Sequence, residues 1–258
     1  MAEAPILSYR SARKLIGTLG LLLPVVLIVS AYLPGGAFKP TISGFYYSSA
    51  GSFMVGIIAA LAAFLWSYIG HTQTSWRNPF PSDKFLSQVA ASSGALVALV
   101  PTDPPGGFSV ENCAVLACVL KDWGLTDTGV SYVHTAFGTV FFVSLGVFAL
   151  VNFRRSNQAF TLGKYGRNFV FLVCGIVVFA ATALMGLYFL APSAAIALQR
   201  LIGANAIFWL ESIAVWAFAL AWFVKGRTAG WLGDLAMISL GRLICTLRGI
   251  GPLPPAEP

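Results

Sequence analysis

The sequence predicts an all-α membrane protein, a polytopic bundle of six transmembrane helices. Of its 258 residues, 57% are hydrophobic and only 10% are charged, whereas soluble domains carry about 25% charged residues. The mean hydropathy is +0.80, and the apolar residues gather in continuous runs close to the ~20 residues that a helix needs to cross a bilayer. Transmembrane β-strands alternate polar and apolar residues, so helices are favoured over a barrel.

Six runs have the length and composition of a membrane-spanning helix, and the third is the shortest. The expected spans lie at about residues 15–33, 47–70, 85–101, 132–153, 168–190 and 202–224. We expect residues 1–225 to form one transmembrane domain and residues 226–258 to form a cytoplasmic tail. In that tail, polar Ser239, Arg242 and Thr246 recur at helical spacing opposite apolar residues. This spacing predicts an amphipathic helix on the inner membrane surface.

The basic residues predict the orientation of the bundle. With the amino terminus in the cytoplasm, 13 of the 16 Lys and Arg residues fall on the cytoplasmic side. Only Lys39, Lys121 and Arg200 fall outside. Cytoplasmic loops carry an excess of Lys and Arg, so we expect both termini in the cytoplasm. The net charge of +7 then faces anionic lipid and gives no reason to expect a nucleic-acid partner.

The long outer loop, about residues 102–131, holds two of the four cysteines. Cys113 and Cys118 have C-x4-C spacing, and the outer side of the membrane is oxidising, which favours a disulfide between them. Two free thiols on one helical turn are the alternative.

Glu211 is the sharpest functional signal in the chain, because it lies within the last apolar run, Leu201 to Val224. A carboxyl group in hydrocarbon is costly unless it is paired, protonated or facing a wet cavity. Glu211 either makes a structural hydrogen bond to a neighbouring helix, or it lines a cavity that holds a polar ligand, a cation or a proton. Transport is disfavoured, because spans one to three show no clear repeat in spans four to six.

Other polar residues are expected in the same outer half of the bundle, and with Glu211 they define a candidate ligand pocket. They are Tyr46, Tyr47, Ser48, Ser49, Asp103, His134 and Asn205. The alternative is structural: His134 and Asp103 pair at the membrane surface and fix the outer ends of two helices.

The chain offers a thin set of metal ligands. Zinc takes three or four His, Cys or carboxylate ligands, but the chain has two histidines, and His71 falls on the cytoplasmic side. Only His134, Asp103 and Glu211 remain outside. A Ser-His-Asp site is disfavoured because no nucleophile elbow surrounds Ser48 or Ser49. We expect no cofactor and no metal, with zinc as the alternative.

Four segments, in chain order, resemble an uncharacterised group of bacterial six-helix membrane proteins. They are SGFYYSSAGSFMVG, DKFLSQVAASSGALVALVPT, HTAFGTVFFVSLGVFAL and FWLESIAVWAFALAWFVKG. They are more distantly similar to domain-of-unknown-function and DRAM/Sfk-type membrane families. The resemblance covers roughly residues 40–226. It implies the six-helix topology and a multi-pass place in the bacterial cytoplasmic (inner) membrane, and it implies no activity.

A second similarity is to membrane hydrolases of the alkaline ceramidase and progestin/adiponectin receptor superfamily. Those proteins hold zinc with serine, aspartate and histidines in a seven-helix bundle, with a paired histidine motif near the carboxyl terminus. This chain has six expected helices and Glu211 where that motif would lie. The departure removes most of the zinc site.

We therefore expect a non-enzymatic integral membrane protein with an outward-facing polar pocket. It would be an accessory subunit of a larger membrane protein complex, or a protein that binds lipid or a small ligand. The alternative is a membrane-embedded, metal-dependent hydrolase of lipid amides or esters. The expected partners are the lipid bilayer and such a complex.

Overall fold

The computed structural model describes residues 3–70, 81–102, 115–155 and 161–250. Within these ranges the chain forms helices and no strand, which confirms the all-α fold class. In chain order, its elements are α1 (Glu3–Ala31), the 3-10 turn η1 (Ser43–Tyr47), α2 (Gly51–Ser67), α3 (Asp83–Leu99), α4 (Val115–Asp122), α5 (Asp127–Val147), the π-helical turn η2 (Phe148–Asn152), α6 (Leu162–Leu190), α7 (Pro192–Ile202), α8 (Ala206–Lys225) and α9 (Gly230–Leu247).

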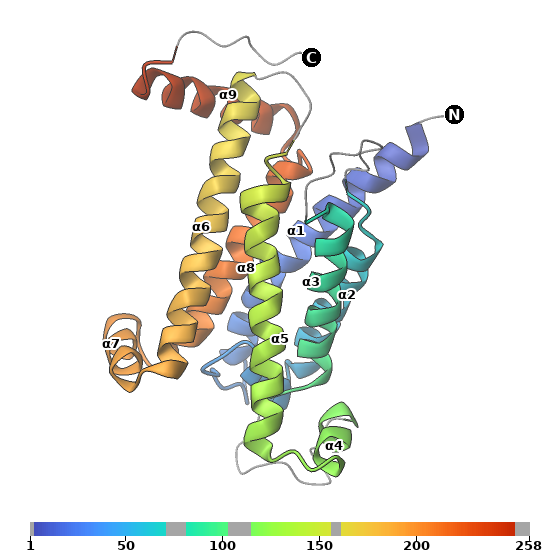
Figure 1. Cartoon of the computed structure of the whole chain (residues 1–258), viewed down its shortest axis with the longest axis vertical. Helices are drawn as coiled ribbons and strands as arrows, with labels where there is room; N and C mark the ends of the chain where they lie inside the picture. Colours follow the sequence, from blue (N-terminus) through green and yellow to red (C-terminus); the bar gives the residue numbers. More distant parts are fainter. Residues whose placement is uncertain (1–2, 71–80, 103–114, 156–160, 251–258) are drawn as a thin grey trace.

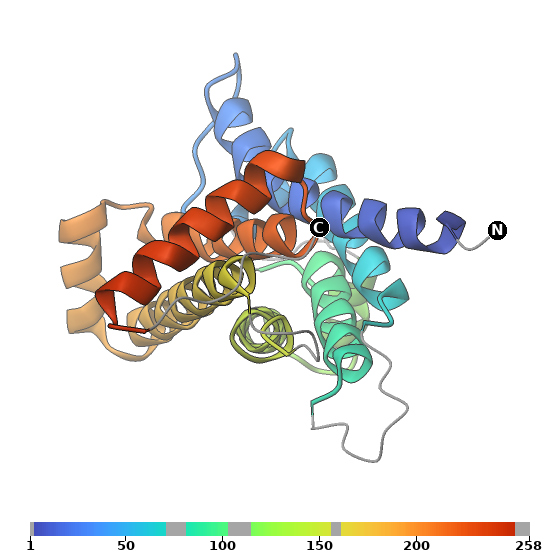
Figure 2. The ribbon, with the colours of Figure 1, turned by 90° about the horizontal axis from the view of Figure 1, so that it is seen from above.

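Six of these helices pack as a closed ring, which Figure 2 shows from one end. Around the ring α1 packs on α2, α2 on α3, α3 on α5, α5 on α6, α6 on α8, and α8 on α1. Each of these helices overlaps one of the six apolar runs, with ends that differ from the expected ones. The short helices α4 and α7 lie at the opposite end of the molecule from α9 (Figure 1).

Five helical segments are long and apolar enough to cross a membrane, judged by length and composition among the described residues. They are Ser11–Ala31, Asp127–Asn152, Leu162–Leu190, Ala206–Lys225 and Gly230–Leu247. The runs expected at 47–70 and 85–101 form α2 and α3, of 17 residues each. Helix α2 begins later than expected because residues 43–47 form the separate turn η1.

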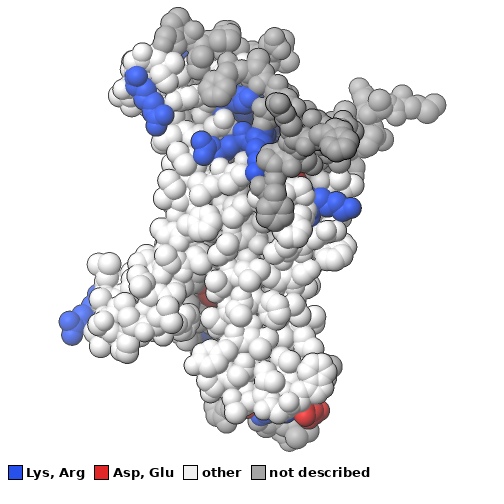
Figure 3. Space-filling view, in the orientation of Figure 1, with Lys and Arg blue, Asp and Glu red and all other residues white. Residues whose placement is uncertain are grey.

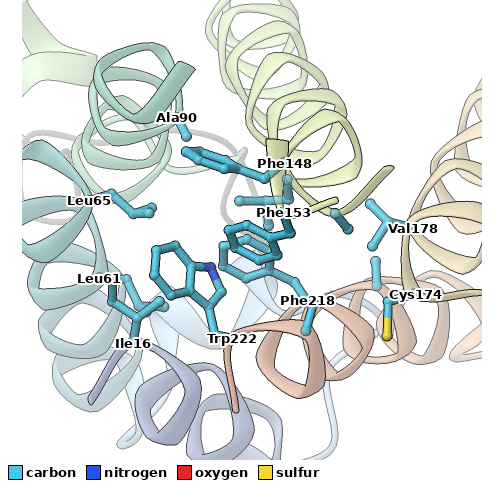
Figure 4. Close-up of a cluster of buried hydrophobic side chains, with 14 of the residues drawn as sticks. Ile16, Leu61, Leu65, Ala90, Phe148, Phe153, Cys174, Val178, Phe218 and Trp222 are labelled. Atoms are coloured by element: carbon cyan, nitrogen blue, oxygen red, sulfur yellow. The ribbon is translucent and has the colours of Figure 1, made fainter. Parts of the chain in front are cut away.

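Aromatic side chains fill the ring interior near the carboxyl-terminal end of α8 (Figure 4). Trp222 is fully buried, and its ring lies 4.9 Å from that of Tyr68 and 5.0 Å from that of Phe153, both edge-on. Such pairs contribute about 0.5–1.5 kcal/mol beyond the area that they bury. Beside them, the Asn152 side-chain amide donates to Asp83 Oδ1 at 2.7 Å, which ties η2 to the start of α3.

Helix α9 does not join the ring but crosses the amino-terminal end of α6 at a steep angle (Figure 1). The two backbones meet at Gly166 and Gly241. A Cβ atom on Gly166 would clash with the Met237 carbonyl, and one on Gly241 would clash with the Leu162 carbonyl. Glycine permits this close approach. Although α9 is long and apolar enough to cross a membrane, it lies across the end of α6 and outside the six-helix ring. This is the orientation expected of a surface helix.

On the face shown in Figure 3, charged side chains gather toward the two ends of the molecule, and the middle is largely uncharged. Most Lys and Arg on this face lie at the end that carries α9. At the opposite end are Arg200 of α7 and Lys121 of α4, and Lys121 pairs with Asp127 at 2.5 Å. An uncharged belt between charged ends is the surface expected of a protein that crosses a bilayer.

Candidate functional site

A cavity with an empty volume of about 660 Å³, counted with its opening, lies inside the ring. It is enclosed by α1, α2, α3, α5, α8 and the segment that follows α1. Its walls are apolar except for three side chains, Ser43, His134 and Glu211. The lining residues are Gly20, Leu23, Ile42, Ser43, Ile58, Leu61, Leu65, Val97, His134, Gly138, Phe141, Phe142, Leu145, Glu211, Val215 and Phe218.

The segment between α1 and η1 is bonded to the first turns of α8. The first backbone N–H groups of a helix have no partner within the helix. Here Phe208 N–H, in the first turn of α8, donates to the Pro40 carbonyl at 2.8 Å. Two residues further along the segment, Ile42 N–H donates to Glu211 Oε2 at 2.5 Å. Ile42 is buried and lines the cavity beside Ser43, so the end of this segment forms part of the cavity wall.

Glu211 is half-buried, and only one of its oxygens is bonded within the described residues. Oε2 accepts from Ile42 N–H, and Oε1 receives no hydrogen bond from that part of the chain. A carboxyl group in apolar surroundings is stabilised when its oxygens are hydrogen-bonded. Glu211 lines the cavity, and Oε1 is its oxygen that is left to accept a hydrogen bond from another partner.

His134 is held between two oxygens. Its Nδ1 lies 2.5 Å from the Val100 carbonyl, and its Nε2 lies 2.8 Å from the Ser43 hydroxyl. A carbonyl can only accept, so Nδ1 carries the hydrogen and donates to Val100. In the neutral ring Nε2 then accepts from Ser43. The imidazole is thus fixed in one tautomer, with the Ser43 hydroxyl aimed at it.

The polar side chains of the cavity belong to η1, α5 and α8, whereas its hydrocarbon walls come from five helices. A hydroxyl, an imidazole and a carboxyl group can orient a small polar group. The surrounding leucine, valine and phenylalanine side chains can bury an alkyl chain. The cavity therefore has the chemistry needed for an amphipathic molecule.

Of the residues predicted for the pocket, His134 and Glu211 line the cavity together, whereas Tyr46, Tyr47, Ser48, Ser49 and Asn205 do not line it. Tyr47 donates its hydroxyl to the Thr102 carbonyl at 2.9 Å, and its ring packs edge-on against that of Tyr46. Ser48 donates to the Phe45 carbonyl at 2.6 Å, and Ser49 is exposed.

Two further residues, Asn205 and Asp103, were predicted for the pocket. Asn205 precedes α8 as its N-cap and makes no side-chain capping bond, and it does not line the cavity. Asp103 lies outside the described residues, so its pairing with His134 stays a prediction. Among the residues that the structure describes, His134 bonds to the Val100 carbonyl and to Ser43.

Ser43 is a cavity residue that sequence reasoning did not single out. It lies four residues before the expected second span, and neither periodicity nor apolar flanks distinguish it from Ser48 and Ser49. The only signal was its place before Gly44 and the tyrosine pair. It joins the site because η1 turns the chain inward.

None of the described cysteines lines this cavity, whereas two of the three residues weighed as metal ligands, His134 and Glu211, do. Cys118 is disulfide-bonded, Cys174 and Cys245 are buried free thiols, and Cys113 lies outside the described residues. Within those residues, no group of three or more His, Cys, Asp or Glu side chains is arranged to hold a metal ion. Both nitrogens of His134 are also already engaged, so zinc would have to displace the Ser43 hydroxyl from Nε2.

No family model, no curated protein and no solved structure matches this chain.

Proposed function

We propose that this protein binds a single-chain amphipathic molecule, such as a long-chain alcohol, a long-chain amine or a monoacyl lipid. The alkyl chain occupies the apolar part of the cavity, and the head group donates a hydrogen bond to Glu211 Oε1. The observation that carries the proposal is that Glu211, with one carboxyl oxygen left without a hydrogen bond among the described residues, lines a cavity whose walls are apolar apart from Ser43 and His134. The role is binding, alone or as an accessory subunit of a larger membrane protein complex.

The proposal includes a topology of six membrane spans, with both termini in the cytoplasm of a bacterial cell and the protein in its inner membrane. The closed ring of α1, α2, α3, α5, α6 and α8 supports this topology. The gathering of Lys and Arg at the end that carries α9 supports the orientation. Helix α9 then lies on the cytoplasmic surface, and Ser43, His134 and Glu211 face the outer half of the bilayer.

Photo-crosslinking with a long-chain alcohol that carries a diazirine at its chain end tests the binding. The wild-type protein is expected to be labelled on peptides of α2, α5 or α8 that line the cavity. Gly138 lines the cavity, and a Cβ atom placed there would have its nearest neighbour at 4.0 Å, so a side chain can be added without a clash at Cβ. Gly138→Leu should therefore fill part of the cavity and abolish the labelling. Gly56→Leu is the matched control, because Gly56 has no neighbour within 4 Å and lies outside the cavity.

Equal labelling of wild type and Gly138→Leu would overturn the proposal, and so would labelling confined to lipid-facing residues. Competition by an unlabelled long-chain amine, without competition by the matching alkane, is the expected sign that a polar head is recognised.

A second candidate function is the hydrolysis of a lipid ester or amide, favoured by the 2.8 Å contact between Ser43 Oγ and His134 Nε2. In this reaction Ser43 Oγ attacks the acyl carbonyl and passes its proton to Nε2, which then protonates the leaving alcohol or amine. Water completes the cycle by releasing the acyl group from Ser43. A fluorophosphonate probe, which labels activated serines, tests this function. Labelling of the wild type that is lost in Ser43→Ala would support hydrolysis, and absence of labelling in the wild type would contradict it.

A further inference from the structure

A second hollow lies at the other end of the bundle, where α6, α8 and α9 meet. Its empty volume is about 810 Å³, including its opening. One wall is apolar and comes from α8, with Leu220, Phe223 and Val224. Leu220 is 49% exposed, so this wall opens sideways toward the surface that faces lipid in the proposed topology.

The other wall of this hollow is charged. Arg167 of α6 and Arg227, in the turn between α8 and α9, both approach the carboxylate of Asp234. Two guanidinium groups and one carboxylate leave a local net charge of +1. Within the described residues, neither guanidinium makes a hydrogen bond. The N–O distances to Asp234 are 3.6 Å and 3.7 Å, longer than the ~2.7–2.9 Å of a charge-assisted hydrogen bond.

Two more features make the same place favourable for an anion. Thr228 lines the hollow, and its buried hydroxyl oxygen has no hydrogen-bond partner among the described residues. Helix α9 begins there at Gly230, with no side-chain cap and no acidic residue in its first turn. The partial positive charge of its amino terminus therefore adds to that of the two arginines in this hollow.

We infer that this hollow binds one anionic phospholipid of the inner leaflet. The phosphodiester carries one negative charge, which balances the local excess of +1, and its oxygens accept from Arg167, Arg227 and Thr228. The acyl chains lie against Leu220 and Phe223. Basic pockets between transmembrane helices on the cytoplasmic side suit such head groups. This inference rests on the proposed topology and is independent of the ligand in the central cavity.

Native mass spectrometry of the full-length protein in detergent, titrated with phosphatidylglycerol, tests the site. Loss of one charge-assisted contact is worth about 1.5 kcal/mol or more, so Arg167→Gln and Arg227→Gln should each weaken binding roughly tenfold. Asp234→Asn removes the competing carboxylate and should tighten binding several-fold. Arg242→Gln is the matched control: this arginine is exposed on α9, outside the hollow, and its loss should leave binding unchanged.

Arg167→Gln is expected to weaken lipid binding and Asp234→Asn to tighten it. This difference distinguishes recognition of the lipid from a loss of folding, which would weaken binding in both variants. If Asp234→Asn weakens binding as much as Arg167→Gln, the three charges only hold α9 in place, and the inference fails. Equal binding of phosphatidylcholine, or equal loss in Arg242→Gln, would show nonspecific attraction instead. If free glycerol phosphate, at the same concentration as the lipid, displaces it from the protein, the site binds a soluble phosphate. The inference of a phospholipid site would then be wrong.

Discussion

Ile42 and Glu211 are 169 residues apart in the chain, and the backbone N–H of the first donates to the carboxyl group of the second at 2.5 Å. This bond gives a partner to a buried backbone donor and to a carboxyl group within a candidate membrane span at the same time. It also holds the segment after α1 against α8, where the central cavity has its polar groups.

Two substitutions of Glu211 distinguish the contribution of its hydrogen bond to stability from that of its ionisable group. Glu211→Gln keeps an oxygen that can accept from Ile42 N–H, so its unfolding midpoint should stay close to that of wild type. Glu211→Leu leaves the donor unpaired and should cost about 1–3 kcal/mol. The measurement is the apparent thermal midpoint of purified protein in one detergent at one heating rate. Equal midpoints for Gln and Leu would show that the bond contributes nothing to stability.

The His134 bonds can be removed one at a time. In His134→Asn, the side-chain amide nitrogen takes the place of Nδ1 and can still donate to the Val100 carbonyl. The shorter asparagine side chain no longer reaches Ser43. Ser43→Ala removes the same contact from the other side. If the contact stabilises the fold, the double variant should be destabilised by about 1 kcal/mol less than the sum of the two single variants.

Thermal unfolding of wild type, both single variants and the double variant completes this cycle. Thr139→Ala serves as the control, since that exposed hydroxyl donates to the Thr135 carbonyl of its own helix. Strict additivity of the two changes would mean that Ser43 and His134 do not interact in solution.

The crossing of α6 and α9 depends on glycine. Gly166→Ala should separate the two helices, because its Cβ atom would collide with the Met237 carbonyl and backbone atoms cannot move aside as a flexible side chain can. Limited proteolysis should then cut the α9 segment faster than in wild type. Gly186→Ala, also on α6, is the matched control with no neighbour within 4 Å, and unchanged proteolysis of Gly166→Ala would contradict this packing.

Single cysteines test the proposed orientation. Ser49→Cys and Arg242→Cys each replace an exposed residue, at opposite ends of the bundle. A membrane-impermeant maleimide should label Ser49→Cys in intact cells, and Arg242→Cys only after the membrane is opened. The reverse pattern would invert the topology, and labelling of both in intact cells would rule out a cytoplasmic α9. The buried native thiols Cys174 and Cys245 provide the background measurement.

Much of the helical fold followed from composition and periodicity. The six expected runs correspond to α1, α2, α3, α5, α6 and α8, because an apolar run of this length satisfies its backbone only as a helix in hydrocarbon. A helix was also expected in the tail, residues 226–258, and α9 (Gly230–Leu247) lies there. The ends of helices were less accurate: α2 begins at Gly51 instead of residue 47.

The sequence by itself determined the fold class, and it identified Glu211 and His134, because a carboxyl group or an imidazole in an apolar run must find a partner wherever it lies. Only the tertiary structure decided which partners they have. Ser43 reaches His134, and Ile42 reaches Glu211, because η1 folds inward between α5 and α8. Such contacts join residues far apart in the chain through a turn without hydrophobic periodicity, so local sequence pattern carries no record of them.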